Sequence, residues 1–142
     1  MPAAKLYVGL IADTHSLLRP EAVAALRGCD CIIHAGDICE PEILAALEDI
    51  APVTAVRGNN DRGGWAASIR ETEVLRLGEA IIYIIHDLAA MDVDPRAQGF
   101  HAVISGHSHR PLSATRDGVL FVNPGSAGRA ASVCRYRSGA WL

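Results

Sequence analysis

The amino-acid sequence predicts an α/β fold in which two β-sheets pack against each other and helices lie outside them. Two observations lead to this prediction. The first half of the 142-residue chain alternates apolar strand-like segments with helix-like segments, whereas the second half is mostly strand-like. A β-α-β-α-β order is typical of a parallel sheet with helical cover. Because the strands outnumber what one small sheet needs, two packed sheets are the economical arrangement.

The elements of the first half are bounded by proline, glycine and short polar segments. Each expected helix has proline in its first turn, where the fixed φ of proline suits the helix, and Gly28 follows the first helix. The expected strands are Lys5–Ala12, Cys31–Ala35 and Val53–Arg57, and the expected helices are Pro20–Arg27 and Pro41–Ile50.

Two turn signals organise the second half. Gly78-Glu79 and Asp117-Gly118 each separate two strand-like segments, which is typical of a β-hairpin. The expected strands are Thr72–Leu77, Ala80–His86, Ala102–Ser105, Leu112–Arg116, Val119–Val122 and Ser132–Arg137.

The composition is that of a globular protein, and we expect residues 1–142 to form a single domain. Half of the residues are hydrophobic and the net charge is only -3, so there is no electrostatic reason to expect a nucleic-acid partner or a membrane surface. The apolar stretches are too short to cross a bilayer and the N-terminus lacks signal-peptide features, so the expected location is cytoplasmic. No C-x-x-C pair is present, so the cysteines are interpreted as small core residues; they are Cys29, Cys31, Cys39 and Cys134.

Five polar segments come directly after expected strands, where α/β sheets bind ligands. They are Asp13-x-His15, Gly36-Asp37, Gly58-Asn59-x-Asp61, His86-Asp87 and Gly106-His107-x-His109. Each segment alone is more typical of a turn or a core histidine than of a ligand site. Together they contain four of the six histidines, and this combination favours a metal site.

Spacing within these segments predicts chelation. Residues two apart on an extended segment point the same way, so Asp13 with His15, and His107 with His109, are each expected to chelate. The glycines Gly36, Gly58 and Gly106 permit tight turns and close backbone approach beside the site.

In this order the five segments resemble the motifs of the calcineurin-like metallophosphoesterase superfamily: D-x-H, G-D, G-N-H-D/E, H and G-H-x-H. The resemblance runs from about Lys5 to Ser126. The small size and the segment from Asn123 to Ser126 resemble the small prokaryotic phosphodiesterase branch. That resemblance implies an αββα sandwich of two mixed sheets flanked by helices.

The resemblance also implies two divalent metal ions and a role for each motif residue. Asp37 bridges the two ions, which share a hydroxide that attacks phosphorus without a covalent enzyme intermediate. The first ion is held by Asp13, His15, Asp37 and His109, and the second by Asp37, Asn59, His86 and His107. Mn²⁺ is the expected ion, with Ni²⁺, Fe and Zn²⁺ as alternatives.

The chain departs from the family pattern at two positions. Asn60 stands where the family has a catalytic-acid histidine, and an amide can hydrogen-bond a phosphate oxygen but cannot protonate a leaving group. Asn60 and Asp61 are the expected catalytic residues, with Asp61 able to orient an imidazole placed at position 60. Asp87 stands where the family usually has glycine. It is either an acceptor for a ligand histidine or a solvated loop residue, and the second interpretation is slightly favoured.

Three functions remain open from the sequence. The favoured one is a metal-dependent phosphodiesterase acting on a small phosphate ester. The alternatives are a phosphomonoesterase or nucleotide phosphatase with the same site, and a binding scaffold like the retromer subunit that shares this fold. Trp141 and Leu142 either cap the core or form a contact in a homodimer. His34 and His101 are expected to be structural, and four arginines near the motifs are more typical of solvated side chains than of phosphate ligands; they are Arg57, Arg62, Arg110 and Arg129.

Overall fold

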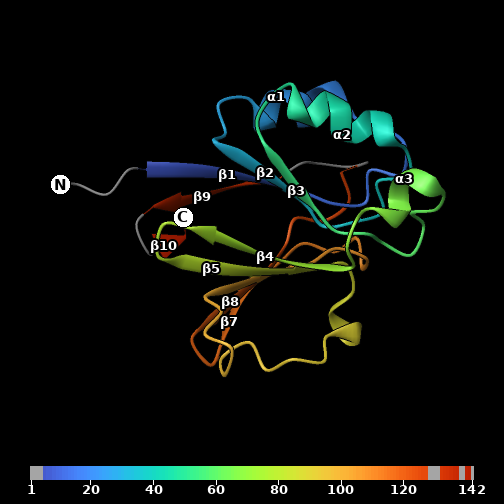
Figure 1. Cartoon of the computed structure of the whole chain (residues 1–142). Helices are drawn as coiled ribbons and strands as arrows, with labels where there is room; N and C mark the ends of the chain where they lie inside the picture. The colour runs from blue at the N-terminus through green and yellow to red at the C-terminus, as the bar shows by residue number, and fades with distance from the viewer. Residues whose placement is uncertain (1–4, 128–131, 138–139, 142) are drawn as a thin grey trace.

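Two five-stranded sheets form the body of the protein, which we describe from a computed structural model (Figure 1). The structure describes residues 5–127, 132–137 and 140–141. The strand order is β10-β9-β1-β2-β3 in the first sheet and β4-β5-β6-β8-β7 in the second. Both sheets contain parallel and antiparallel pairs, so the predicted sandwich of two mixed sheets is confirmed.

The first sheet holds the β-α-β-α-β opening of the chain. Strand β1 pairs in parallel with β2, which pairs in parallel with β3, and β9 adds to β1 antiparallel. Helices α1 and α2 cover the outer face of this sheet (Figure 1). The bounds are β1 Lys5–Ile11, α1 Pro20–Leu26, β2 Cys31–His34, α2 Pro41–Glu48, β3 Val53–Ala55, β9 Ser132–Arg137 and β10 Ala140–Trp141.

The second sheet is built around two antiparallel hairpins, β4–β5 and β7–β8, which turn at the two predicted positions. Strand β6 joins the hairpins by pairing in parallel with β5 and β8. The bounds are β4 Thr72–Leu77, β5 Ala80–Ile85, β6 Ala102–Ile104, β7 Leu112–Arg116 and β8 Val119–Asn123.

Each predicted strand and helix is present, with ends that differ from the prediction by at most two residues. Three short elements were not predicted, and they are α3 Gly64–Ala67, the 3₁₀ helix η1 Leu88–Ala90, and β10. Each contains only two to four residues, too few for a hydrophobic period to be recognised.

The main core lies between the two sheets, because alternate residues of each strand face inward. Leu10 of β1 faces Ile82 and Ile84 of β5 in this layer, while the next residue, Ile11, packs under the helices with Leu26. A third cluster on the outer face of the second sheet includes Tyr83 and is covered by residues 88–100. The packed sheets hold the loops at their ends in fixed relative positions.

Candidate metal centre

The five polar loops meet at one end of the sandwich and are hydrogen-bonded to one another. The Asp13 N–H donates to the carbonyl of Gly36 at 2.9 Å, and the Gly106 N–H donates to the carbonyl of His86 at 2.9 Å. The His107 N–H donates to Asp13 Oδ2 at 3.1 Å, which ties the first motif to the last. Residues that are 94 positions apart in the chain therefore share one site.

Asp13, His15 and His109 form what we call the first group, whose possible ligand atoms all lie within 4.8 Å of one another. The Nε2 atoms of His15 and His109 are 3.3 Å apart. Asp13 Oδ1 lies 3.5 Å from Nε2 of His109 and 3.9 Å from Nε2 of His15. One carboxylate oxygen and two ring nitrogens thus converge on one point.

Asp37, His86 and His107 form the second group. The Nδ1–H of His86 donates to the carbonyl of Ala35 at 2.7 Å, so in the neutral ring Nε2 carries a lone pair that faces the site. That nitrogen lies 3.0 Å from Asn59 Oδ1 and 3.3 Å from Nδ1 of His107. Lone pairs of nitrogen and oxygen that lie this close repel one another, so this arrangement is expected where a cation binds between them.

Asp37 lies between the two groups. Its Oδ2 atom is 3.7 Å from His15 Nε2 of the first group and 3.4 Å from His86 Nε2 of the second. Asn60 donates to both Asp37 oxygens, through its backbone N–H at 2.9 Å and its side-chain amide at 3.0 Å. The position of Asp37 is therefore that of a carboxylate able to serve both groups.

The backbone carries strain at this site. Five residues of the two groups have positive φ, a conformation that is uncommon outside glycine; they are Asp13, His15, Asp37, His107 and His109. Such conformations cost on the order of 1–3 kcal/mol each and cluster at functional sites. We interpret this cost as a loss of folding stability that is needed to direct the side chains into the two groups.

These dihedral angles correct the chelation expected from extended segments. Asp13 and His15 do belong to one group, but they reach it through a left-handed turn. His107 and His109 do not chelate together, because one lies in each group. The division of these two histidines is the one implied by the family resemblance.

Two glycines allow the loops to approach closely. A side chain at Gly58 would collide with the carboxylate and backbone of Asp37. A Cβ at Gly36 would lie 2.6 Å from the ring of His86, and Gly36 also has a φ of 99°. Both positions exclude larger residues because functional side chains fill the space.

One oxygen of Asp13 indicates that a metal ion fits this site, because it is buried and accepts no hydrogen bond in the described part of the chain. Asp13 is 1% exposed, and its Oδ1 has no hydrogen-bond partner among the described residues. Burial, the largest influence on this carboxyl, raises its pKa above the ordinary value, while nearby His86 and His109 act in the opposite direction. An anionic oxygen costs free energy there unless a cation compensates it. Together with the imidazole and amide atoms around it, this donor set suits a divalent ion.

Asp61 is hydrogen-bonded to backbone N–H groups. Its carboxylate accepts hydrogen bonds from the backbone N–H groups of Asp37, Cys39 and Gly58 at 2.8 to 3.0 Å. Both oxygens are used in these bonds, so Asp61 holds two loops together instead of facing the groups. In this structure Asp61 positions the two loops, and its expected catalytic role stays a prediction.

Buried polar residues support the site from behind. His34 is fully buried, and its Nδ1 accepts from the Gly36 N–H while Nε2 faces the hydroxyl of Thr14 at 3.1 Å. Burial, the largest cause, lowers the pKa of His34 to about 3, so this ring is neutral near pH 7. Asn123 donates to the Gly106 carbonyl at 2.9 Å, a supporting role that the sequence did not predict.

Asp87 and Cys39 lie closer to the groups than the sequence indicated. Asp87 Oδ2 is 3.8 Å from Nε2 of His107, while Oδ1 accepts the Ala89 N–H at the start of η1. Cys29 is buried in the fold as expected, but Cys39 is only partly buried and its Sγ is 3.8 Å from Nδ1 of His15. The side chains of Arg129, Cys134, Trp141 and Leu142 lie outside the described residues.

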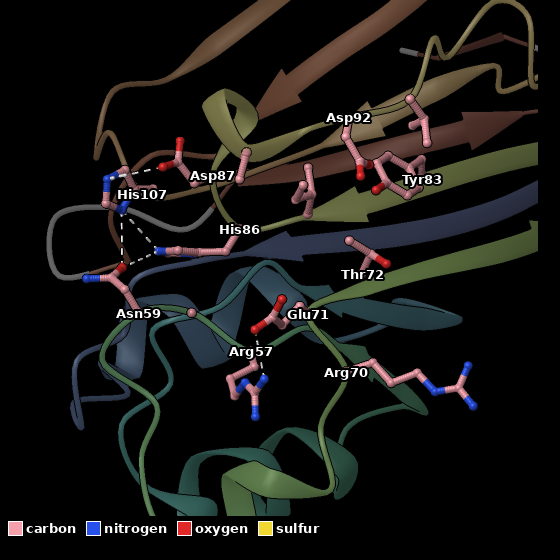
Figure 2. Close-up of a pocket in the computed structure, with 14 residues that line it drawn as sticks. Arg57, Asn59, Arg70, Glu71, Thr72, Tyr83, His86, Asp87, Asp92 and His107 are labelled. Atoms are coloured by element: carbon pink, nitrogen blue, oxygen red, sulfur yellow. Dashed lines mark hydrogen bonds and ion pairs between the residues drawn. The ribbon is translucent and has the colours of Figure 1, made fainter.

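A cavity of about 870 Å³ opens beside the second group (Figure 2). Asn59, His86 and His107 line one end of it, and Thr72, Tyr83 and Asp92 line the other. The volume lies within the range of pockets that bind small organic molecules.

Comparisons with known proteins show what the chain is similar to. The sequence model of a protein family, the calcineurin-like phosphoesterase superfamily domain, matches residues 6–137. A probable metallophosphoesterase of Methanothermobacter thermautotrophicus is 36% identical over 132 residues, which cover 85% of this chain and 77% of that protein. A phosphodiesterase of Methanocaldococcus jannaschii is 24% identical over 151 residues, covering 93% and 87% of the two chains.

The structure of vacuolar protein sorting 29 from Cryptosporidium parvum has the same fold, with a TM-score of 0.77 and 21% identity over 99% of this chain and 96% of that one. No helix in the described part of the chain has the length and apolar character needed to cross a bilayer.

Proposed function

This chain belongs to the calcineurin-like phosphoesterase superfamily, and from that premise we propose that it is a phosphodiesterase that works with two divalent metal ions. Members of this family use divalent metals, and the two groups of the candidate centre have the donor atoms for them. The phosphodiesterase of Methanocaldococcus jannaschii supports the choice of a diester substrate.

The position of Asp37 carries the proposal. A single oxygen of this residue lies within 3.7 Å of a histidine nitrogen from each group, which is the arrangement needed by two ions that share a ligand. The first ion would be held by Asp13, His15, Asp37 and His109, and the second by Asp37, Asn59, His86 and His107. When bound, two neighbouring ions lower the pKa of water and offset the charge on phosphoryl oxygens.

Neighbouring residues orient the proposed metal ligands. Ala35 fixes the ring of His86, and Asn60 fixes Asp37 by two hydrogen bonds. In hydrolysis the water oxygen bonds to phosphorus while the bond to the leaving oxygen breaks, and that oxygen finally takes a proton. Asn60 cannot supply this proton in the transition state. We therefore expect aryl esters, whose leaving oxygen needs little protonation, to react faster than alkyl esters.

We propose Mn²⁺ as the ion, because carboxylate, amide and imidazole ligands without thiolate suit it. Metal-free protein is titrated with MnCl₂ by calorimetry, and hydrolysis of bis(4-nitrophenyl) phosphate and of 4-nitrophenyl phosphate is followed in parallel. The expected result is binding of two ions, activity only with metal, and faster reaction of the diester. The variant Glu79→Gln, which changes an exposed turn, is the control.

Each other outcome has a definite meaning. Full activity of verified metal-free protein would exclude the two-metal mechanism. Faster hydrolysis of the monoester would favour a phosphomonoesterase, and binding of two ions without activity on either ester would favour a scaffold. Tighter binding or higher activity with Ni²⁺, Fe²⁺ or Zn²⁺ would replace Mn²⁺ as the proposed ion.

A further inference from the structure

We propose that the cavity beside the second group binds one of the two organic groups of the diester, and that this group is uncharged, of about nucleoside size, and carries hydrogen-bond donors. The inference rests on the proposed function and assigns its substrate class. Asn59, His86 and His107 connect the cavity to the proposed metal centre, whereas lining residues that are not proposed metal ligands indicate the ligand class.

The location of the cavity connects it to the reacting phosphate. Asn59, His86 and His107 line its inner end, and the same three residues surround the proposed second ion (Figure 2). A phosphoryl group held at the two groups would therefore have one ester oxygen near this end of the cavity. An organic substituent on that oxygen can extend between strand β5 and the loop that carries η1.

The apolar part of the wall is a fixed surface. Tyr83 and Ile85 are alternate residues of β5 and are 6% exposed each, on the face of the sheet away from the main core. The ring of Tyr83 is stacked on Phe100 with centroids 5.0 Å apart and planes 5° apart, so its position is fixed by packing. Val93, from the covering loop, completes an apolar lining that suits a flat organic group.

The charged part of the wall excludes a second anion. Three carboxylates line the cavity, Glu71, Asp87 and Asp92, against two arginines. The arginines have carboxylate neighbours, since Arg57 donates to Glu71 at 2.8 Å and Arg70 Nε lies 3.9 Å from Glu73. An added phosphate would meet a surplus of negative charge, whereas hydroxyl and N–H donors would find acceptors.

The same charges distinguish a diester from a monoester. The organic group proposed for the cavity is the one on the oxygen that does not leave. A phosphomonoester has no such group, so it would turn an unsubstituted, negatively charged oxygen toward the cavity and leave it empty. A diester fills the cavity with an uncharged group and gains the burial of its apolar surface. The cavity thus gives a physical reason for preferring diesters, independent of the chemistry of the ions.

Ala89 and Ala90 provide a matched pair for testing this assignment. Both are exposed residues of the short helix η1, but only Ala90 lines the cavity. Ala90→Phe should place a phenyl ring inside the cavity and narrow it, and Ala89→Phe should add the same bulk outside it. Because neither side chain is part of the buried core, both variants are expected to fold, which circular dichroism checks.

The first measurement needs no metal and no activity. Thymidine, an uncharged probe with hydroxyl and N–H donors, is titrated into metal-free protein and followed by NMR. Wild type and Ala89→Phe should bind it with similar affinity, and Ala90→Phe should bind it roughly tenfold more weakly or worse. Absence of binding to wild type, or equal binding by all three proteins, would overturn the assignment of the cavity while leaving diester hydrolysis in place.

The second measurement uses two diesters with the same leaving group, thymidine 5′-(4-nitrophenyl) phosphate and methyl 4-nitrophenyl phosphate. The ratio of their kcat/KM values should favour the thymidine ester in wild type and Ala89→Phe, and should fall roughly tenfold in Ala90→Phe. An unchanged ratio would overturn the proposal. One further outcome is that thymidine binds in the cavity while neither diester is hydrolysed in the presence of metal. That result would exclude the proposed phosphodiesterase function, and only the assignment of a nucleoside-like ligand to the cavity would remain.

Discussion

The first group has one buried ligand, Asp13, and two exposed ones, since His15 and His109 are 37% and 48% exposed. The second group has two buried ligands, Asp37 and His86, at 2% and 6%, and one exposed one, His107, at 45%. The two groups have similar chemistry, but the fold holds them differently. The His86 ring is fixed by the Ala35 carbonyl, and Asp37 receives two hydrogen bonds from Asn60. The exposed rings of the first group lose more conformational entropy when they become ordered around an ion.

Because of this difference, the two proposed ions should bind with unequal affinity. A site whose ligands are already oriented loses less free energy on binding, so the second group should hold its ion more tightly. Stepwise chelation should remove the ion of the first group before that of the second.

The largest effect is expected at Asp37, whose Oδ2 lies within 3.7 Å of a histidine nitrogen in each group. Asp37→Asn removes the negative charge near both histidine sets, so the affinity for both ions should fall by roughly 100-fold or more, and activity should be lost with it. Calorimetry and metal analysis measure the two affinities. Two tightly bound ions together with normal turnover would rule out a shared ligand.

Asp13→Asn should weaken metal binding at the first group and leave the second group unaffected. Asp13 contributes to the first group alone, so its affinity should fall by about tenfold or more while the second ion remains bound. Metal analysis after dialysis should give close to one ion per chain in place of two. Equal loss of both ions would show that the groups act as one unit.

A smaller effect is expected at Asp87, which faces His107 of the second group. Asp87→Asn keeps the acceptor for the Ala89 N–H but removes the charge near Nε2 of His107. Because the two atoms are 3.8 Å apart and both side chains are partly exposed, the second ion should bind about tenfold less tightly at most. Asp92→Asn, which removes a charge elsewhere in the cavity, is the control for metal affinity. Equal affinities in Asp87→Asn and wild type would support a solvated loop residue.

The smallest effect concerns the stability of the metal-free protein. In Asp13→Asn the amide oxygen can keep the hydrogen bond from the His107 N–H, and the amide N–H₂ can donate toward His109 Nε2. Replacing a buried, unpaired anionic oxygen in this way should raise the free energy of unfolding by about 1 kcal/mol. Thermal unfolding in the presence of a chelator measures the change. A clear loss of stability would mean that the Asp13 carboxylate stabilises the fold even without an ion.

Local signals in the sequence predicted most of the fold. Proline at the first helical turns and the two hairpin signals are effects of neighbouring residues, so they can be recognised without tertiary contacts. Helix α3 was missed because its four residues, which begin at Gly64, contain no such signal. The division of His107 and His109 between the groups was also beyond spacing alone, because it depends on two positive φ angles that the surrounding loops impose.

The sequence by itself determined the family, the sandwich of two mixed sheets and the set of polar residues that follow the strands. Order along the chain is sufficient for these conclusions, since motifs and hairpins are local. The tertiary structure decided which side chains share a group, that the Asp61 carboxylate holds backbone N–H groups, and that a cavity lies beside His86. These features depend on atoms from loops that are far apart in the chain, and only the packing of the two sheets brings those loops within hydrogen-bonding distance.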